Sequence, residues 1–128
     1  MAEYQPGVCN IGAEQRRARR RSGVGSFGLA AAVVLAVVLD VAPATALWAT
    51  APFVFGGWVG LVQDYYGFCV AFGALARYDL TGSGGTTGSV ADAEAVAADR
   101  RRALVILGVT AVLTVVTTAP VVALGGAV

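Results

Sequence analysis

The chain has 128 residues, of which 57% are hydrophobic and 13% are charged, and its mean hydropathy is +0.72. A soluble domain carries about a quarter charged residues, so this composition argues against a water-soluble globular protein and indicates that lipid covers much of the surface. The net charge of +1 argues against a nucleic-acid partner, and the absence of histidine removes the commonest general base and metal ligand.

Residues 1–23 are polar and end in a basic run. Pro6-Gly7 predicts a turn. The run contains five arginines, Arg16, Arg17, Arg19, Arg20 and Arg21. We interpret residues 1–23 as a short cytoplasmic N-terminal arm and the arginines as its topological anchor, with binding of anionic lipid headgroups or nucleic acid as the alternative.

Residues 24–42 form the first predicted span and contain one charge, Asp40, near the outer end. The segment reaches roughly 28 Å as a helix, close to the ~30 Å hydrocarbon core of a bilayer. A basic region, an apolar core and Ala44-Thr45-Ala46 also imitate a cleaved signal peptide. We favour a retained helix, because the core is long and contains Asp40 and another apolar run follows directly.

Residues 46–63 form the second predicted span, with Trp48 at one end and Tyr65-Tyr66 beyond the other, as in the aromatic belts of membrane proteins. An alternative helix would run from Pro52 to about residue 75. It would place the Asp64 carboxylate inside the membrane, which costs a few kcal/mol or more, so we prefer the shallower register.

Residues 103–124 carry no charge and form the third predicted span. Before it, residues 81–88 have the composition of a flexible loop. Ser89 then fits a helix N-cap, because Asp92 follows at the capping-box position. We expect one helix from about residue 89 to 118, kinked or ended by Pro120.

The distribution of arginine predicts the orientation of the spans. All nine arginines lie in residues 1–23 or in the connecting loop 64–102, and the outer turn and C-terminal tail have none. The positive-inside rule therefore predicts a cytoplasmic N-terminus and an outer C-terminus in the cell membrane. A fourth span over residues 67–78 would place three arginines outside. The predicted fold class is an all-α integral membrane protein with a three-helix membrane domain over residues 24–128.

Small residues recur at four-residue spacing on two of the spans. Gly28 and Ala32 share a face of the first, and Gly56 and Gly60 form a GxxxG motif in the second. These faces serve either packing within the chain or contacts in a homo-oligomer or larger membrane complex. Thr110, Thr114 and Thr117 form a stripe on the third span that either bonds its own helix or lines a polar path.

Cys9 and Cys69 are the only cysteines. The predicted topology places both at the inner membrane face, and the arm is long enough to fold back so that Cys9 reaches Cys69. Together they would form a redox-sensing dithiol or bind a soft metal ion, and a dimer would supply four thiolates. The alternative is two buried, unreactive thiols.

The segment Cys9-Asn10-Ile11-Gly12, followed by Glu14 and the arginine run, and the later Phe68-Cys69 and Phe72-Gly73 resemble a group of small multi-pass membrane proteins without assigned activity. The resemblance covers about the first two thirds of the chain. It implies a helical membrane fold and a role for both motifs, but it supplies no catalytic residue.

No motif in the chain specifies a reaction, so we expect neither an enzyme nor a cofactor. The function that fits best is a small membrane accessory or assembly protein. A thiol sensor or metal-binding protein that uses Cys9 and Cys69 is the first alternative. A small oligomeric transporter is the second.

Overall fold

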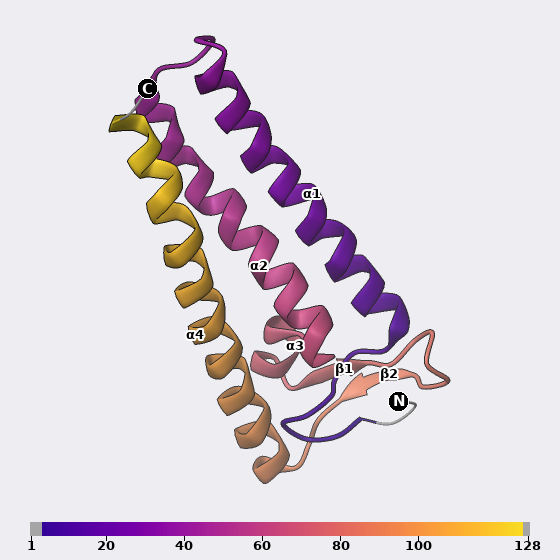
Figure 1. Cartoon of the computed structure of the whole chain (residues 1–128). Coiled ribbons are helices and arrows are strands. Elements are labelled where there is room, and N and C mark those ends of the chain that lie inside the picture. The colour runs from indigo at the N-terminus through magenta and orange to yellow at the C-terminus, as the bar shows by residue number, and fades with distance from the viewer. Residues whose placement is uncertain (1–3, 127–128) are drawn as a thin grey trace.

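The computed structural model describes residues 4–126, and the ends of the two predicted domains, residues 1–3 and 127–128, lie outside the described residues. Three long helices dominate the fold (Figure 1). They are α1 (Ala13–Val38), α2 (Thr50–Tyr66), which directly follows the 3-10 turn η1 (Ala44–Ala49), and α4 (Ala93–Ala123), which leads into the short turn η2 (Leu124–Gly126). All three helical segments are long and apolar enough to cross a membrane.

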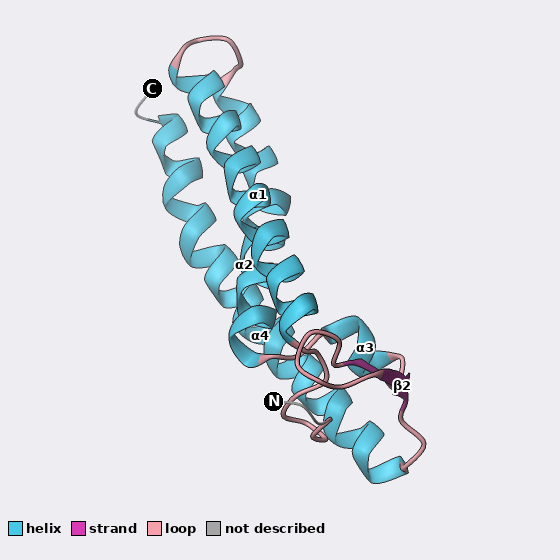
Figure 2. Ribbon diagram, turned by 90° about the vertical axis from the view of Figure 1, so that its right-hand side faces the viewer, coloured by secondary structure: helices cyan, strands magenta, loops and turns pink. Residues whose placement is uncertain are grey.

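The helices form an open row with α2 in the middle. One side of α2 packs against α1 and the other against α4, whereas α1 and α4 do not pack along each other within residues 4–126 (Figures 1 and 2). The hydrophobic core lies between α2 and α4 and consists of Val62, Phe68, Ala103 and Ile106. Because the row does not close into a bundle, most apolar side chains of α1 and α4 face outwards, which suits a lipid environment.

Glycines let α1 and α2 approach closely. A Cβ on Gly60 would lie 2.6 Å from the carbonyl oxygen of Arg19 and 2.7 Å from the Cα of Gly23, both of which are backbone atoms. A Cβ on Gly56 would lie 2.6 Å from the hydroxyl of Ser26. The GxxxG motif of Gly56 and Gly60 is therefore used for packing within the chain. In contrast, Gly28 has open space around it, and Ala32 is exposed.

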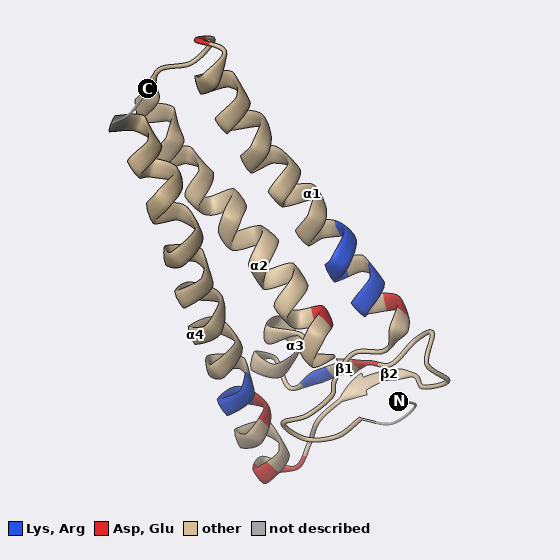
Figure 3. Ribbon diagram, in the orientation of Figure 1, with Lys and Arg blue, Asp and Glu red and all other residues tan. Residues whose placement is uncertain are grey.

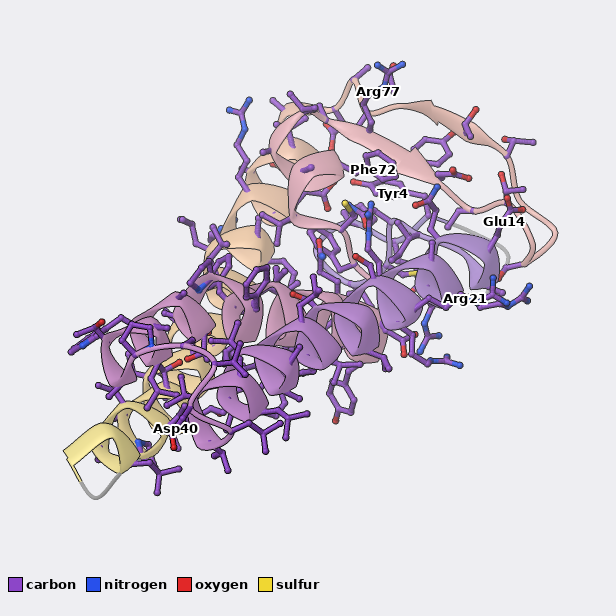
Figure 4. All side chains as sticks on the ribbon, turned by 90° about the horizontal axis from the view of Figure 1, so that it is seen from above. Tyr4, Glu14, Arg21, Asp40, Phe72 and Arg77 are labelled. Atoms are coloured by element: carbon purple, nitrogen blue, oxygen red, sulfur yellow. The ribbon has the colours of Figure 1, made fainter. Side chains whose placement is uncertain are left out.

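The charges separate along the long axis of the molecule. All nine arginines lie at the end that carries the N-terminal arm, and Asp40 lies at the opposite end (Figures 3 and 4). We call these the arginine end and the Asp40 end. As a helix of 31 residues, α4 is roughly 46 Å long, more than the ~30 Å hydrocarbon core. Its first turns, which carry Arg100, Arg101 and Arg102, therefore extend beyond the apolar span.

A small segment between α2 and α4 adds structure that was predicted as loop. It contains the short helix α3 (Val70–Ala74) and an antiparallel hairpin of β1 (Arg77–Asp79) and β2 (Thr87–Ser89). The all-α fold class was therefore wrong in this detail. The glycine-rich loop 81–88 forms the tip of the hairpin, with Gly82 and Gly84 at positive φ.

One predicted helix start was wrong, and another helix extends upstream of its predicted span. The helix α1 begins at Ala13 and not near residue 24, because the arginine run consists of good helix formers. Residues 13–23 of the predicted arm are therefore helical. The cap of α4 is Asp92, whose side chain accepts a hydrogen bond from the Ala95 N–H at 3.1 Å, whereas Ser89 pairs with Arg77 in the hairpin. The uninterrupted course of α4 from the polar segment into the third span was predicted correctly.

The other boundaries follow from local chemistry. Pro52 lies in the first turn of α2, where a helix needs no N–H from it. Gly67 ends α2 in the left-handed conformation, so this helix does not continue to residue 75. The helix α4 continues through Pro120 to Ala123.

The threonine stripe of α4 mostly binds its own helix. The hydroxyls of Thr114 and Thr117 donate to the carbonyls of Thr110 and Leu113, one turn earlier. The indole N–H of Trp58 on α2 also donates to the Thr117 hydroxyl at 2.9 Å. These contacts support helix packing, so the stripe gives no evidence for a polar path.

The glycine contacts predict different effects for two matched substitutions. We expect Gly60→Ala to destabilise the protein by about 1–3 kcal/mol, because the added methyl group meets the α1 backbone. Gly28→Ala is the control, and it should be neutral or slightly stabilising because alanine favours helices and meets nothing. Unfolding in detergent, followed by circular dichroism, measures both. Equal stability of the two variants would contradict the observed α1–α2 packing.

Candidate functional site at the arginine end

The described part of the N-terminal arm, residues 4–12, folds back onto the helices. It begins with a tight turn in which the Val8 N–H donates to the Gln5 carbonyl at 3.0 Å. Pro6 and Gly7 occupy the two central positions, and Gly7 has φ +69°, as a type II turn requires. The turn predicted from Pro6-Gly7 is therefore confirmed. It directs the following residues into the protein, where Cys9, Asn10 and Ile11 are buried.

Asn10 fastens the arm to the end of α2. Its side chain is fully buried, and it binds the backbone of Cys69 twice. The amide Nδ2 donates to the Cys69 carbonyl at 3.1 Å, and Oδ1 accepts from the Cys69 N–H at 2.6 Å. An asparagine amide carries one donor group and one acceptor side by side, so it pairs with a peptide group as a strand would. The Asn10 N–H also donates to the Gly67 carbonyl at 3.2 Å.

The arm continues beside β1 and leads into α1. The Gly12 N–H donates to the Asp79 carbonyl at 2.7 Å, and the Asp79 N–H donates to the Asn10 carbonyl at 2.8 Å. A Cβ on Gly12 would lie 2.5 Å from the Leu80 carbonyl oxygen, so only glycine fits here. Ile11 is 1% exposed between these contacts. The Cys-Asn-Ile-Gly motif is therefore a docking segment for the arm.

The hairpin loop caps the first turn of α1. The start of α1 has no side-chain cap from its own sequence neighbours. Instead, the Ser83 hydroxyl accepts a hydrogen bond from the Ala13 N–H at 2.8 Å, and the Thr81 carbonyl accepts one from the Glu14 N–H at 3.2 Å. The amide of Gln15 donates to Asp79 at 2.9 Å. Hydrogen bonds from Thr81 and Gln15 hold the pKa of Asp79 below its usual range.

The predicted cysteine pair is wrong. Cys9 and Cys69 are both free and buried, and they form neither a disulfide nor a pair. The Cys9 thiol donates to the Ile11 carbonyl at 3.4 Å, and a Cβ on Gly67 would lie 3.9 Å from its sulfur. The arm does fold back as predicted, but the side chain that binds Cys69 is that of Asn10. Adjacent side chains of an extended segment point in opposite directions, so Asn10 and Cys9 do not both face Cys69.

The sulfur of Cys69 has a cationic neighbour instead. Arg19 Nη2 donates to Cys69 Sγ at 3.1 Å, and the Arg19 guanidinium lies 6.0 Å from the ring centroid of Phe72. Among residues 4–126, no three His, Cys, Asp or Glu side chains gather into a group that could hold a metal ion. The two cysteines proposed as metal ligands thus occupy separate environments.

Part of the arginine run also binds α2. Arg20 forms two hydrogen bonds with the Asp64 carboxylate, at 2.8 and 3.3 Å. Arg16 donates to the Asp64 carbonyl at 2.9 Å and lies 3.4 Å from its carboxylate. These arginines therefore hold the start of α1 against the end of α2, in addition to any role as a topological anchor. Arg17 and Arg21 are exposed.

Asp99 of α4 anchors the turn of the arm. The carboxylate is fully buried and accepts hydrogen bonds from the Gly7 N–H at 2.7 Å and from the Tyr4 hydroxyl. Arg102 completes the contact, because its Nε donates to the Gly7 carbonyl at 2.8 Å. Burial and the neighbouring Asp99 carboxylate raise the pKa of Tyr4, so its hydroxyl remains a hydrogen-bond donor. The Tyr4 ring stacks on the ring of Tyr78, with the two ring centroids 5.1 Å apart.

Sequence reasoning missed both Asn10 and Asp99 as anchors. An aspartate beside three arginines at the start of a helix is typical of a solvated surface, and nothing local marks Asp99 as buried. Asn10 lies inside the motif singled out above, but its partner is a backbone group, which leaves no signature in the sequence. Figure 4 shows that Tyr4, Phe72 and Arg77, which come from three segments, lie at this end of the molecule and Asp40 at the other.

No protein-family model matches the chain, and no curated protein or solved structure is significantly similar to it. Function must therefore be argued from the geometry of the arginine end and of the helix faces.

The Asn10 contacts predict the reactivity of the thiols. We expect Cys9 and Cys69 to resist a water-soluble maleimide in the folded protein, because both are buried. Asn10→Ala removes two hydrogen bonds to Cys69 and should release the arm, so both thiols become labelled, as intact mass would show. Gln15→Ala is the control, since it removes an amide that does not touch Cys69. Equal labelling of the two variants would show that Asn10 does not hold the arm.

Proposed function

We propose that this protein is a small multi-pass membrane accessory or assembly protein, which acts by packing against other membrane proteins and not by catalysis. The observation that carries the proposal is the open row of helices. Three helical segments are long and apolar enough to cross a membrane, yet of the other two long helices in the described chain α1 packs along α2 alone. Because the three helices form an open row and not a closed bundle, the outer face of α1 is free to contact other membrane proteins.

The outer face of α1 supports this proposal. Gly25 and Gly28 on this face have open space around them, and Ala32 is exposed. Small residues at such spacing let a second helix approach closely in a membrane. Gly56 and Gly60, by contrast, already pack within the chain, so they are not part of the proposed contact.

The side chains of the arginine end also favour a structural role. Asn10 and Asp99 are fully buried, and the atoms that would do chemistry are occupied by backbone groups or by Tyr4. The resemblance to small multi-pass membrane proteins, carried by the Cys-Asn-Ile-Gly motif, agrees with this reading because that motif docks the arm.

The orientation that we propose places the N-terminus and the arginine end in the cytoplasm, and the C-terminus outside. The support is the gathering of all nine arginines at one end, with the C-terminal turn η2 at the other (Figure 3).

Reporter fusions test the orientation. A fusion after Gly84 should report the cytoplasm, and a fusion after Val128 should report the outside, because an odd number of spans separates them from each other. Alkaline phosphatase, which is active outside, and green fluorescent protein, which is fluorescent inside, give opposite readouts at the two positions. Green fluorescence from the Val128 fusion would contradict the proposed topology.

Site-directed crosslinking tests the accessory role. A photoreactive amino acid at position 28 should form a discrete protein adduct in native membranes, either with a second copy or with another protein. The same residue at Val115 is the matched control, because Val115 is 66% exposed on α4, away from the α1 face. We expect lipid adducts alone from that position. Lipid adducts alone from both positions would contradict the proposal.

A further inference from the structure

A hollow lies between the N-terminal arm and α4, at the point where α4 passes from polar to apolar residues. Its volume is about 310 Å³, and it is lined by Gly7, Ala98, Arg101, Arg102 and Val105. The four α4 residues share one helix face, because they are three, four and seven positions apart. The small side chain of Ala98 and the absence of one on Gly7 leave the space open.

Two guanidinium groups make the hollow a cationic site. Arg101 is exposed and forms no ion pair or hydrogen bond with any residue from 4 to 126. Arg102 is held in place, because its Nε binds the Gly7 carbonyl and its guanidinium lies 5.4 Å from the Tyr66 ring centroid. The neighbouring carboxylate of Asp99 is already bound by the Gly7 N–H and the Tyr4 hydroxyl. The Asp99 carboxylate therefore faces the N-terminal arm.

Apolar surface continues from the hollow along the same face of α4. Val105 is 49% exposed, a Cβ on Gly108 would meet no neighbouring segment within 4 Å, and Val112 is 62% exposed. A second hollow of about 300 Å³ begins at Val112 and is lined by apolar side chains alone. From the arginine end along this face of α4, the surface thus carries two cationic side chains and then an uncharged strip that is indented at Gly108.

We propose that this hollow binds the phosphate of an anionic phospholipid headgroup, with an acyl chain of the lipid along Val105, Gly108 and Val112. Guanidinium groups bind phosphate oxygens through paired hydrogen bonds, and basic pockets beside membrane helices bind anionic headgroups. A free phosphate ion shares the headgroup chemistry, but it would not use the apolar strip. The proposal needs only that the chain is embedded in a membrane, and it is independent of the accessory role proposed above.

The arm forms one wall of the site, so lipid binding and arm docking are coupled. Gly7 has φ +69°, and a Cβ there would lie 3.2 Å from the Ala98 Cβ. A lipid that binds only the docked arrangement must stabilise it by the same factor as docking strengthens lipid binding. The arm thereby becomes sensitive to the charge of the surrounding lipid.

Native mass spectrometry of the full chain, released from a neutral detergent, tests the site by counting bound lipid. Three probes are added separately, namely phosphatidylglycerol, phosphatidylcholine and inorganic phosphate. We expect phosphatidylglycerol to bind most tightly and Arg101→Gln to weaken it about fivefold. Arg17→Gln is the matched control, because it removes the same charge from an exposed position on α1 and should leave the affinity unchanged.

The outcomes separate the alternatives. Unchanged phosphatidylglycerol binding in Arg101→Gln, or equal weakening in Arg17→Gln, would overturn the site. Equal affinity for inorganic phosphate would overturn its assignment to a lipid. Gly7→Ala keeps both arginines but strains the arm, so it should also weaken phosphatidylglycerol binding. Wild-type affinity in Gly7→Ala would overturn the role of the arm as a wall of the site.

Discussion

The pairing of the Asn10 side chain with the backbone of Cys69 is the contact on which the arginine end depends. Both partners are buried, where an unpaired amide or peptide group costs about 1–3 kcal/mol. This pairing lies beside the buried Ile11 and the contact of Gly12 with Leu80, directly before the first residue of α1. The hairpin is then in place to cap α1. One asparagine thus aligns the arm, the end of α2 and β1.

The molecule combines a closed end with open sides. At the arginine end, polar groups from the arm, the hairpin and α4 satisfy one another, and the fold there resembles the interior of a soluble protein. Along the helices, by contrast, the covered faces are those next to α2 and the face of α4 next to α3. Lipid or other helices must cover the remaining apolar surface, because its exposure to water is unfavourable. The proposed partner face and the proposed lipid site both lie on such uncovered surface, on α1 and α4 respectively.

The sequence predicts the large features because each depends on many residues. Apolar runs of sufficient length mark the three helices, and the one-sided arginines mark the two ends. The details depend on single contacts between distant segments. Ser83 caps α1 across 70 positions, and Asp99 binds Gly7 across 92. Neither residue has a local pattern that names its partner. The cysteine prediction failed for a related reason, because the reach of the arm was predicted correctly but not which of its side chains would face Cys69.

The distant partners of the arm have a consequence for biosynthesis. A nascent chain emerges from the N-terminus, so residues 4–12 leave the ribosome long before Asp99 and Arg102, which hold Gly7. At about 5–20 residues per second, the interval is roughly 5–18 s. During that time α1 and α2 can insert, while the arm has no binding site on α4. The contact of Gly7 with α4 therefore forms last, and a chain truncated before α4 would keep the Asn10 and Gly12 contacts of the arm but lack those of Gly7.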